Sequence, residues 1–111
     1  MIYETYSFDG ELYSIIVGEN KYENSKIVND ANEKDMWFHV ENMPSCHVIL
    51  KTTGLKKIPR QVIKRCAYLC KINSNAKTQR KCNILYTFIY NVKQTEHVGE
   101  VTVKECKIAK V

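Results

Sequence analysis

The sequence predicts one α+β domain, in which a largely antiparallel β-sheet carries one main amphipathic helix and one short helix. Its length of 111 residues fits one domain, because compact domains usually contain about 100–150 residues. Its composition, with 44% hydrophobic and 26% charged side chains, is that of a globular protein with an ordinary core. Apolar and polar side chains alternate as in strands over most of the chain, and apolar side chains recur at helical spacing in two segments. We therefore treat residues 1–111 as a single domain.

The start of the chain predicts a β-hairpin followed by the short helix. Residues 2–8 and 11–17 alternate in β-favouring side chains, and Asp9-Gly10 between them is a dipeptide preferred in tight type I′ turns. Residues 20–29 are polar with spaced apolar side chains, which is typical of a short helix.

The middle of the chain predicts two more strands and then the main helix. Residues 36–41 form the first of these strands, and its alternation sets Met36, Phe38 and Val40 on one face against Trp37, His39 and Glu41. Pro44 interrupts the chain before a second strand over residues 46–51. The main helix covers residues 59–73, with Pro59 suited to its first turn. Its core stripe consists of Val62, Ile63, Cys66, Leu69 and Cys70.

The last third of the chain predicts strands after a basic loop. The loop covers residues 77–81, and a long apolar and aromatic strand is expected over residues 82–92. Two short strands follow, at about 100–104 and 107–111, joined by a tight turn.

Charge is distributed unevenly along the sequence. The formal net charge is +5, yet residues 1–50 hold three lysines and nine acidic side chains, whereas residues 51–111 hold fourteen basic and three acidic ones. No acidic side chain occurs between Glu41 and Glu96, a window with eleven lysines and arginines. These cations cannot pair with each other, so they face solvent, meet the acidic first half or bind a polyanion. Composition leaves a solvated face and a phosphate-binding surface both open.

The cysteines predict reduced thiols in the core. Secreted disulfide frameworks favour even numbers, and structural zinc sites favour C-x₂-C pairs, which this sequence lacks. We expect neither a metal nor a cofactor, and we expect five core thiols: Cys46, Cys66, Cys70, Cys82 and Cys106. Because no apolar run reaches the roughly 20 residues of a membrane span and no signal-peptide pattern opens the chain, we expect a cytoplasmic protein without a membrane partner.

A motif in the middle of the chain resembles that of a known family. Asp35-Met36-Trp37-Phe38-His39-Val40, followed by Pro44-Ser45-Cys46-His47-Val48, is similar to the D-x-W-hydrophobic-H … P-G-S-H-V signature of the NFACT-R domain. That domain is best known from the large ribosome-quality-control proteins NEMF and RqcH. Further matches follow in the family's order along almost the whole chain: Gly18, Asn24, Ile58-Pro59, Cys66-Ala67, Ser74, Tyr86-Thr87, Asn91-Val92-Lys93 and Gly99-x-Val101.

Some positions depart from the pattern of the large proteins. The segment Pro44-Ser45-Cys46-His47 lacks the motif's glycine, and the loop before Gly99 is short. The run Lys21-Tyr22-Glu23-Asn24, together with Ser45, is more similar to the small single-domain eukaryotic members, which usually carry a charged coiled-coil tail. Functions that the large proteins perform with their NFACT-N domain, such as recruiting charged tRNA to a stalled subunit, are not expected of this domain alone.

The resemblance implies nucleic-acid binding, with RNA (tRNA or rRNA) as the expected ligand and the ribosome as a candidate partner. Basic side chains would contact phosphates and position a strand without reading its bases; the candidates are Lys57, Arg60, Lys64, Arg65, Lys71, Lys77, Arg80, Lys81 and Lys93. DNA would use the same surface. Tyr68, Tyr86 and Tyr90 are candidates for base stacking, with Tyr86 the most suited to packing instead.

The motif residues Asp35, Trp37, His39 and His47 allow two interpretations. Trp37 and His39 either form a platform for a base or, as the bulk of a tryptophan favours, Trp37 anchors the core. The two histidines are expected to meet across adjacent strands and to form a polar cluster with Asp35 near the sheet edge. Catalysis is not predicted, because Cys46 and His47 face opposite ways on a strand and no second carboxylate or metal set accompanies the histidines.

We therefore predict a monomeric, non-enzymatic RNA-binding module. The competing hypothesis is a protein-interaction adaptor that docks ribosomal or other partners through complementary charged faces. The salt dependence of binding separates the two hypotheses. Counterion release makes RNA binding far more salt-dependent than protein binding through an apolar hot spot.

Overall fold

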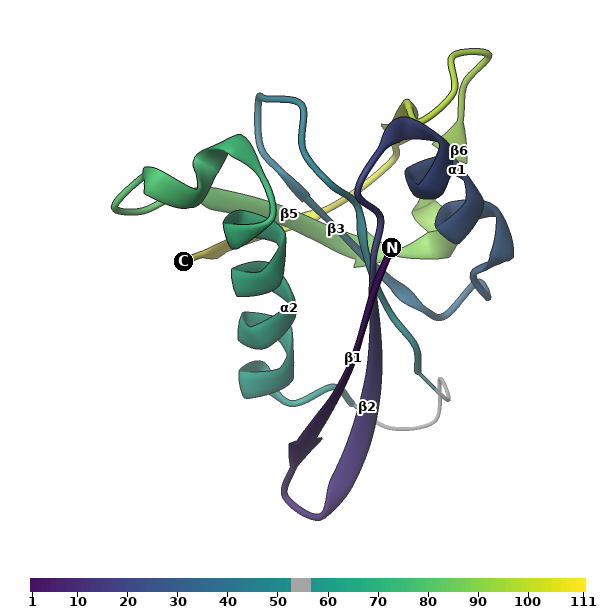
Figure 1. The fold of residues 1–111 in the computed structure, drawn as a ribbon. Coiled ribbons are helices and arrows are strands. Elements are labelled where there is room, and N and C mark those ends of the chain that lie inside the picture. Colours follow the sequence, from purple (N-terminus) through teal and green to yellow (C-terminus); the bar gives the residue numbers. More distant parts are fainter. Residues whose placement is uncertain (53–56) are drawn as a thin grey trace.

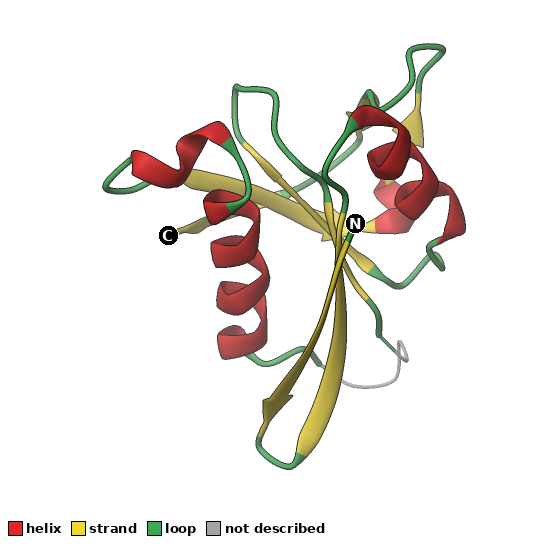
Figure 2. Ribbon diagram, in the orientation of Figure 1, coloured by secondary structure: helices red, strands yellow, loops and turns green. Residues whose placement is uncertain are grey.

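The computed structural model describes residues 1–52 and 57–111 and contains three layers around a central β-sheet (Figure 1). Helix α2 (Arg60–Ile72) covers one face of the sheet, and helix α1 (Lys21–Asp30) covers the other, together with a small second sheet. Figure 2 shows the same layers with the strands running between the two helices. This arrangement confirms the α+β class and the largely antiparallel sheet that the sequence predicts.

The central sheet has six strands in the order β1-β2-β4-β3-β5-β8, and every neighbouring pair is antiparallel. Strands β3 and β4 lie at its centre, whereas β1 and β8 are its edges. The bounds are β1 (Ile2–Phe8), β2 (Glu11–Val17), β3 (Met36–Val40), β4 (Val48–Leu50), β5 (Asn83–Phe88) and β8 (Lys107–Lys110). The second sheet pairs β6 (Val92–Gln94) with β7 (Val101–Val103).

The predicted hairpin and short helix are both confirmed. Strands β1 and β2 pair from Ile2↔Val17 to Phe8↔Glu11, and the turn residues Asp9 and Gly10 have φ angles of 51° and 79°. Two successive positive φ angles are what a type I′ turn requires, and glycine adopts one without strain. Helix α1 begins after Asn20, whose side-chain oxygen accepts hydrogen bonds from the first-turn N–H groups of Tyr22 and Glu23.

The main helix also lies where its spacing predicts. Helix α2 begins at Arg60, one residue after Pro59, so the proline is the N-cap and not the first helical residue. Its buried side chains are Val62, Cys66, Ala67, Leu69 and Cys70, while Ile63 is half-buried at the margin of the stripe. They pack against alternate residues of the sheet, including Phe38, Val48 and Ile84, none of which has measurable exposure.

The prediction of one long strand over residues 82–92 is wrong in its second half. Strand β5 ends at Phe88, opposite Met36 at the start of β3, and the chain then forms the 3₁₀ turn η2 (Ile89–Asn91). The Ile89 N–H donates to the Asp35 carbonyl at 2.8 Å, which turns the chain across the end of β3. Ile89 then packs with α1 on the other face, so the apolar alternation continues although the strand does not.

The last two strands are joined by a short turn, as predicted, but they are not paired with each other. Strand β7 pairs with β6 in the second sheet, whereas β8 pairs with β5 at the edge of the central sheet. The turn between β7 and β8 therefore carries the chain from the α1 side to the sheet edge.

Four of the five cysteines are buried core thiols, as predicted, but Cys106 is exposed in the turn between β7 and β8. A turn residue between two strands of different sheets has no layer above it, so its thiol reaches solvent. None of the helices in the described part of the chain is long and apolar enough to cross a membrane.

Candidate nucleic-acid interface

The tryptophan and histidines of the motif form a buried network on the α1 face of the sheet. Trp37 on β3 is only 2% exposed, and its indole N–H donates to His47 Nδ1 at 3.1 Å. His47 immediately precedes β4, so neighbouring central strands bring the two rings together. Because its Nδ1 accepts a hydrogen bond, the His47 ring is neutral. Burial, with repulsion from His39 as a smaller cause, lowers the pKa of His47 from 6.5 to about 3.

The backbone of His47 is held by two further positions that match the family pattern. The Asn24 side-chain oxygen accepts the His47 N–H at 3.1 Å, and the Gly18 N–H donates to the His47 carbonyl at 3.0 Å. A Cβ at Gly18 would collide with the Asn24 side-chain oxygen and approach its backbone nitrogen to 3.0 Å. Gly18 is therefore needed for the close approach of β2 to α1, and both positions serve the fold around His47.

His39 completes the network from the outer side. Its ring stacks on Trp37 with 5.6 Å between centroids and meets the His47 ring edge-on at 5.0 Å. The contact between His39 Nδ1 and the Val40 carbonyl is 2.6 Å, and only a protonated Nδ1 can donate to a carbonyl. Burial lowers the pKa of His39 as well. The predicted meeting of the two histidines is confirmed, and the burial of Trp37 favours its core role over a stacking platform.

Asp35 does not join the histidines, which corrects the expected polar cluster. Its carboxylate lies at the opposite end of β3 and accepts from Lys51 Nζ at 2.6 Å and from the Thr52 N–H at 2.9 Å. The Asn32 N–H donates to it as well, at 2.9 Å. Asp35 and His39 are four positions apart, a span of about 13 Å at the rise of a β-strand. Asp35 therefore ties together the loops at its own end of the central strands, which are not at the sheet edge.

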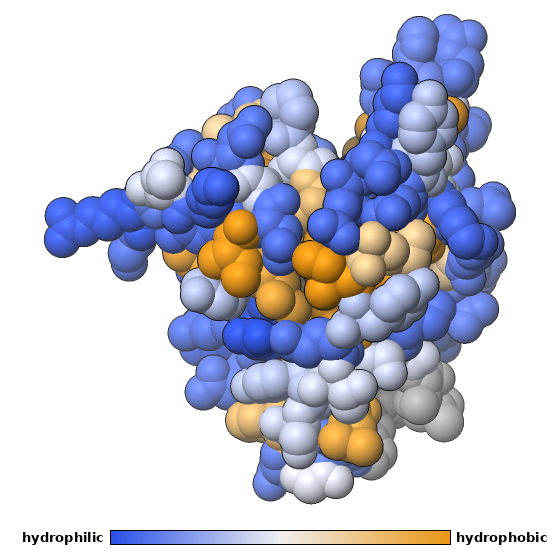
Figure 3. All heavy atoms as spheres, in the orientation of Figure 1, coloured by the Kyte–Doolittle hydropathy of each residue, from blue (hydrophilic) through white to orange (hydrophobic). Residues whose placement is uncertain are grey.

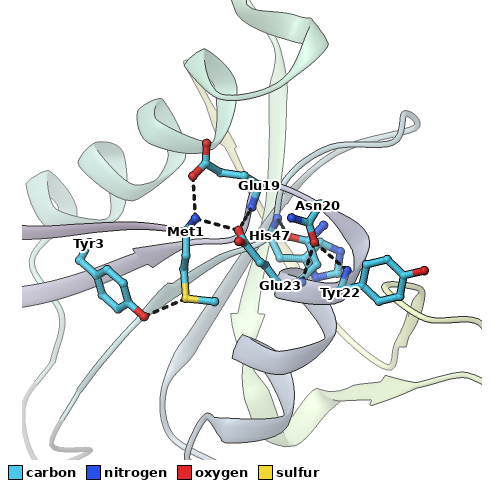
Figure 4. A network of polar contacts seen from close by, with 8 residues as sticks. Met1, Tyr3, Glu19, Asn20, Tyr22, Glu23 and His47 are labelled. Atoms are coloured by element: carbon cyan, nitrogen blue, oxygen red, sulfur yellow. Dashed lines mark hydrogen bonds and ion pairs between the residues drawn. The ribbon is translucent and has the colours of Figure 1, made fainter.

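A cleft of about 740 Å³ opens beside the two histidines, between α1, β7 and the loop that precedes β4. Its charged lining consists of two acidic side chains, Glu19 and Glu100, and one lysine, Lys21. At its rim the Met1 amino group contacts the carboxylates of Glu19 at 2.7 Å and Glu23 at 2.9 Å (Figure 4). Because these cations are balanced by carboxylates, the cleft has no excess positive charge to attract a phosphate.

On the other face of the sheet, helix α2 carries a group of basic side chains. Arg60, Lys64 and Lys71 lie four and seven residues apart on α2 and so share one side of the helix. At the end of α2, Lys71 Nζ donates to the carbonyls of Arg80 and Val111 at 3.4 and 3.2 Å. These bonds hold the loop after the 3₁₀ turn η1 (Asn75–Thr78) and the end of the chain against the helix.

Strand β8 adds two cations that sequence reasoning missed. Lys107 and Lys110 are exposed on this edge strand, which packs beside α2. Lys107 is paired with Tyr86 and points to the α2 face, whereas Lys110, three residues further along, points to the other face at the edge of the sheet. Only the pairing of β5 with β8 brings these lysines close to α2. In the sequence they follow Glu105 and lie outside the acid-free window, so the charge pattern did not indicate them. We call the exposed cations just before and along α2, in the η1 loop and on β8 the basic band: Lys57, Arg60, Lys64, Lys77, Arg80, Lys81, Lys107 and Lys110.

The basic band has no internal neutralisation. Neither residues 57–95 nor β8 contain an acidic side chain, and Glu105 is the nearest acid in sequence, just before β8. Across residues 1–52 and 57–111, no ion pair engages a member of the band. Figure 3 shows hydrophilic side chains projecting far from the body near the loop that follows η1. A row of unpaired surface cations is a surface suited to a polyanion.

Three of the residues predicted for RNA binding lie outside this band, and one of them is Lys71, whose amino group is bonded to the two carbonyls named above. Arg65 is on α2, but its guanidinium donates to the Glu4 carboxylate of β1 at 2.8 and 2.5 Å and lies over the rings of Tyr6 and Tyr68. This pairing lowers the pKa of Glu4 and commits Arg65 to the fold. Lys93 is exposed on β6, in the small sheet that covers the opposite face from α2.

Comparisons with known proteins agree with this fold. A model of the NFACT protein RNA binding domain matches residues 1–105. Coiled-coil domain-containing protein 25 of Bos taurus is 33% identical over an alignment 111 positions long, which covers 95% of this chain and 53% of that protein. The protein of the same name from Danio rerio is 35% identical, over 89% of this chain and 52% of its own length. This chain thus spans about half the length of these relatives.

A solved structure supports the same architecture. The C-terminal part of the fibronectin/fibrinogen-binding protein from Streptococcus suis superposes with a TM-score of 0.85 at 22% sequence identity, covering 96% of this chain and 43% of that one. This likeness shows a shared fold. The match over residues 1–105 and the relatives above 30% identity show that this chain belongs to the NFACT RNA-binding domain family.

Proposed function

We propose that this chain is a non-enzymatic RNA-binding module that holds the phosphates of tRNA or rRNA along the basic band. The observation that supports the proposal is the row of exposed cations on α2, the η1 loop and β8, without an acidic side chain among them. Membership in a family of RNA-binding domains points to the same ligand. By resemblance to the large members of the family, its place would be in the cytoplasm near the ribosome, as a monomer in translation quality control.

The band would act on the backbone of the RNA. Lysine and arginine side chains on a helix and an edge strand reach phosphate oxygens, and each contact releases a condensed counterion. Such contacts set position and orientation but carry little sequence information. We therefore expect binding with weak sequence preference and a steep dependence on salt, with about 0.9 in the log–log slope for each duplex phosphate and about 0.7 for each single-strand phosphate.

The test is a fluorescence-anisotropy titration of labelled tRNA at two salt concentrations, with two matched double variants. Arg60→Glu with Lys64→Glu reverses two charges in the band, whereas Lys21→Glu with Lys26→Glu reverses two exposed charges on α1. We expect the band variant to lose affinity on the order of tenfold or more and to show a shallower salt slope. The α1 variant should bind as the wild type does.

Equal losses in both double variants would overturn the assignment to the band, because net charge alone would then explain binding. The adaptor hypothesis predicts a different result, in which wild-type protein binds no RNA at low salt but docks a protein partner with little dependence on salt. Duplex DNA in the same assay shows whether the surface distinguishes RNA from another polyanion.

A further inference from the structure

A groove on the α2 side of the sheet lies next to the basic band. It has a volume of about 740 Å³, and its apolar wall consists of Met36, Ile58, Ile63, Tyr86 and Phe88. Strand β5 contributes Tyr86 and Phe88 from one face, because alternate residues of a strand point the same way. The groove is thus an aromatic recess between the start of α2 and the edge of the sheet.

One aromatic ring in this groove is poorly covered. Tyr90 in η2 stacks on Phe88 with 5.4 Å between ring centroids and 14° between planes. Tyr90 nevertheless remains 59% exposed, so Phe88 supports one side of the ring while much of its surface faces solvent. Tyr86 is stacked on Phe38 in the core, at 5.7 Å and 16°, which makes it part of the wall. Tyr90 is therefore a flat, supported ring available to a second flat group.

The remaining residues of the groove are polar or charged at its margin. Asn91 Nδ2 donates to Thr87 Oγ1 at 2.9 Å, which orients the amide and leaves its Oδ1 without a partner among the described residues. Lys57 and Lys107, both members of the basic band, line the groove together with one acid, Glu105. The cations that would hold phosphates thus border the exposed ring.

We infer that this groove binds one unpaired nucleobase of an RNA strand, stacked on Tyr90, with the adjoining phosphates on Lys57 and Lys107. The inference rests on the proposed function, and it narrows the ligand to RNA with unpaired bases. A nucleobase is flat, carries hydrogen-bonding groups at its edge and is joined to phosphates, which matches an exposed ring, an oriented amide and bordering cations. An apolar peptide would match the wall but not the two lysines.

The experiment compares a short single-stranded RNA with a blunt RNA duplex of the same length, using wild-type protein and Tyr90→Ala. Because Tyr90 is more than half exposed, the substitution should leave the fold intact. We expect Tyr90→Ala to lose about tenfold in affinity for the single strand and almost nothing for the duplex. Tyr90→Phe, which keeps the ring, should restore binding. Tyr22→Ala is the matched control, since Tyr22 is 67% exposed on α1 and lies outside the groove.

A 2-aminopurine base in the single strand gives an independent signal, because its fluorescence falls when it stacks on an aromatic ring. Quenching by wild-type protein and by Tyr90→Phe, but not by Tyr90→Ala, would support the inference. Equal binding of both RNAs by wild type and Tyr90→Ala would overturn it and leave phosphate binding by the band intact. If wild-type protein bound neither RNA at low salt, the proposed function would fail and this inference with it. Binding of an apolar peptide in place of RNA would contradict both.

Discussion

The two faces of the central sheet use their polar side chains in opposite ways. On the α1 face, the Trp37 N–H, the His47 ring and the Asn24 amide are bonded to one another or to backbone. Along α2 and β8, the basic band reaches solvent with no ion pair inside the described ranges. A satisfied network stabilises a fold and leaves few groups for a ligand, whereas unpaired cations attract polyanions. The motif that reveals the family and the surface proposed to bind RNA are therefore separate parts of the molecule.

Removal of the Trp37 ring should have the largest effect on stability. Trp37→Ala leaves a cavity between β3 and α1 and deprives His47 Nδ1 of its donor. We expect the free energy of unfolding to fall by about 3–5 kcal/mol, measured by urea denaturation. The fraction that stays folded should bind RNA with wild-type affinity. Unchanged stability combined with lost RNA binding would instead identify Trp37 as a stacking platform.

Crowding of Asn24 by a side chain at position 18 should have the second largest effect on stability. Gly18→Ala forces a methyl group against the Asn24 side chain, and we expect a loss of about 1–3 kcal/mol in unfolding free energy. In an Asn24→Ala background the side-chain oxygen is gone, so the same methyl group should cost less. A double-mutant cycle from urea denaturation measures this coupling. Strictly additive effects would show that the close approach of β2 to α1 does not depend on this pair.

The neutral His47 ring should make stability depend on pH. Its pKa in the folded state, about 3, lies below the ordinary 6.5, so the unfolded chain binds a proton between these values while the folded chain does not. Stability is then complete above about pH 6.5 and falls as the pH drops, by up to about 1.4 kcal/mol for each unit. The lowered pKa of His39 acts in the same direction.

His47→Gln is the variant that tests this pH dependence. Its amide oxygen can accept from the Trp37 N–H, but the side chain does not titrate. Urea denaturation between pH 7 and pH 5 should show a weaker pH dependence of the unfolding free energy in the variant. Identical dependence in both proteins would mean that His47 does not carry the effect.

Local features of the fold could be predicted from the sequence, and non-local pairings could not. The Asp9-Gly10 turn and the stripe from Val62 to Cys70 depend on neighbours a few residues away, which a pattern of period 2 or 3.6 records. The end of β5 at Phe88 depends on the carbonyl of Asp35, more than fifty residues earlier, which accepts from the Ile89 N–H. Apolar alternation alone continues through that break because Ile89 and Val92 pack on the opposite face.

Prediction of the candidate site from the sequence meets the same limit, because it too depends on non-local pairing. Lysines on the predicted helix could be proposed from the missing acids, but Lys107 and Lys110 join them only because β8 pairs with β5. Arg65 carries the same charge as Arg60 and lies on the same helix, yet the facing strand places Glu4 within reach of it. Whether a cation is free depends on what the neighbouring strand carries, and one-dimensional spacing does not contain that information.

Charge reversal in the band should have the smallest effect on stability and a large effect on binding. Arg60 and Lys64 are exposed, and a glutamate in the first turn of α2 interacts favourably with the helix dipole, so Arg60→Glu with Lys64→Glu should change the unfolding free energy by less than about 0.5 kcal/mol. Thermal unfolding measured beside the anisotropy titration checks both quantities in one sample. This variant and Trp37→Ala should therefore change stability and affinity in complementary ways, one losing binding and the other folding. If the two properties fell in parallel in both variants, the RNA surface would depend on the Trp37 network, and the two faces of the sheet would not be separable.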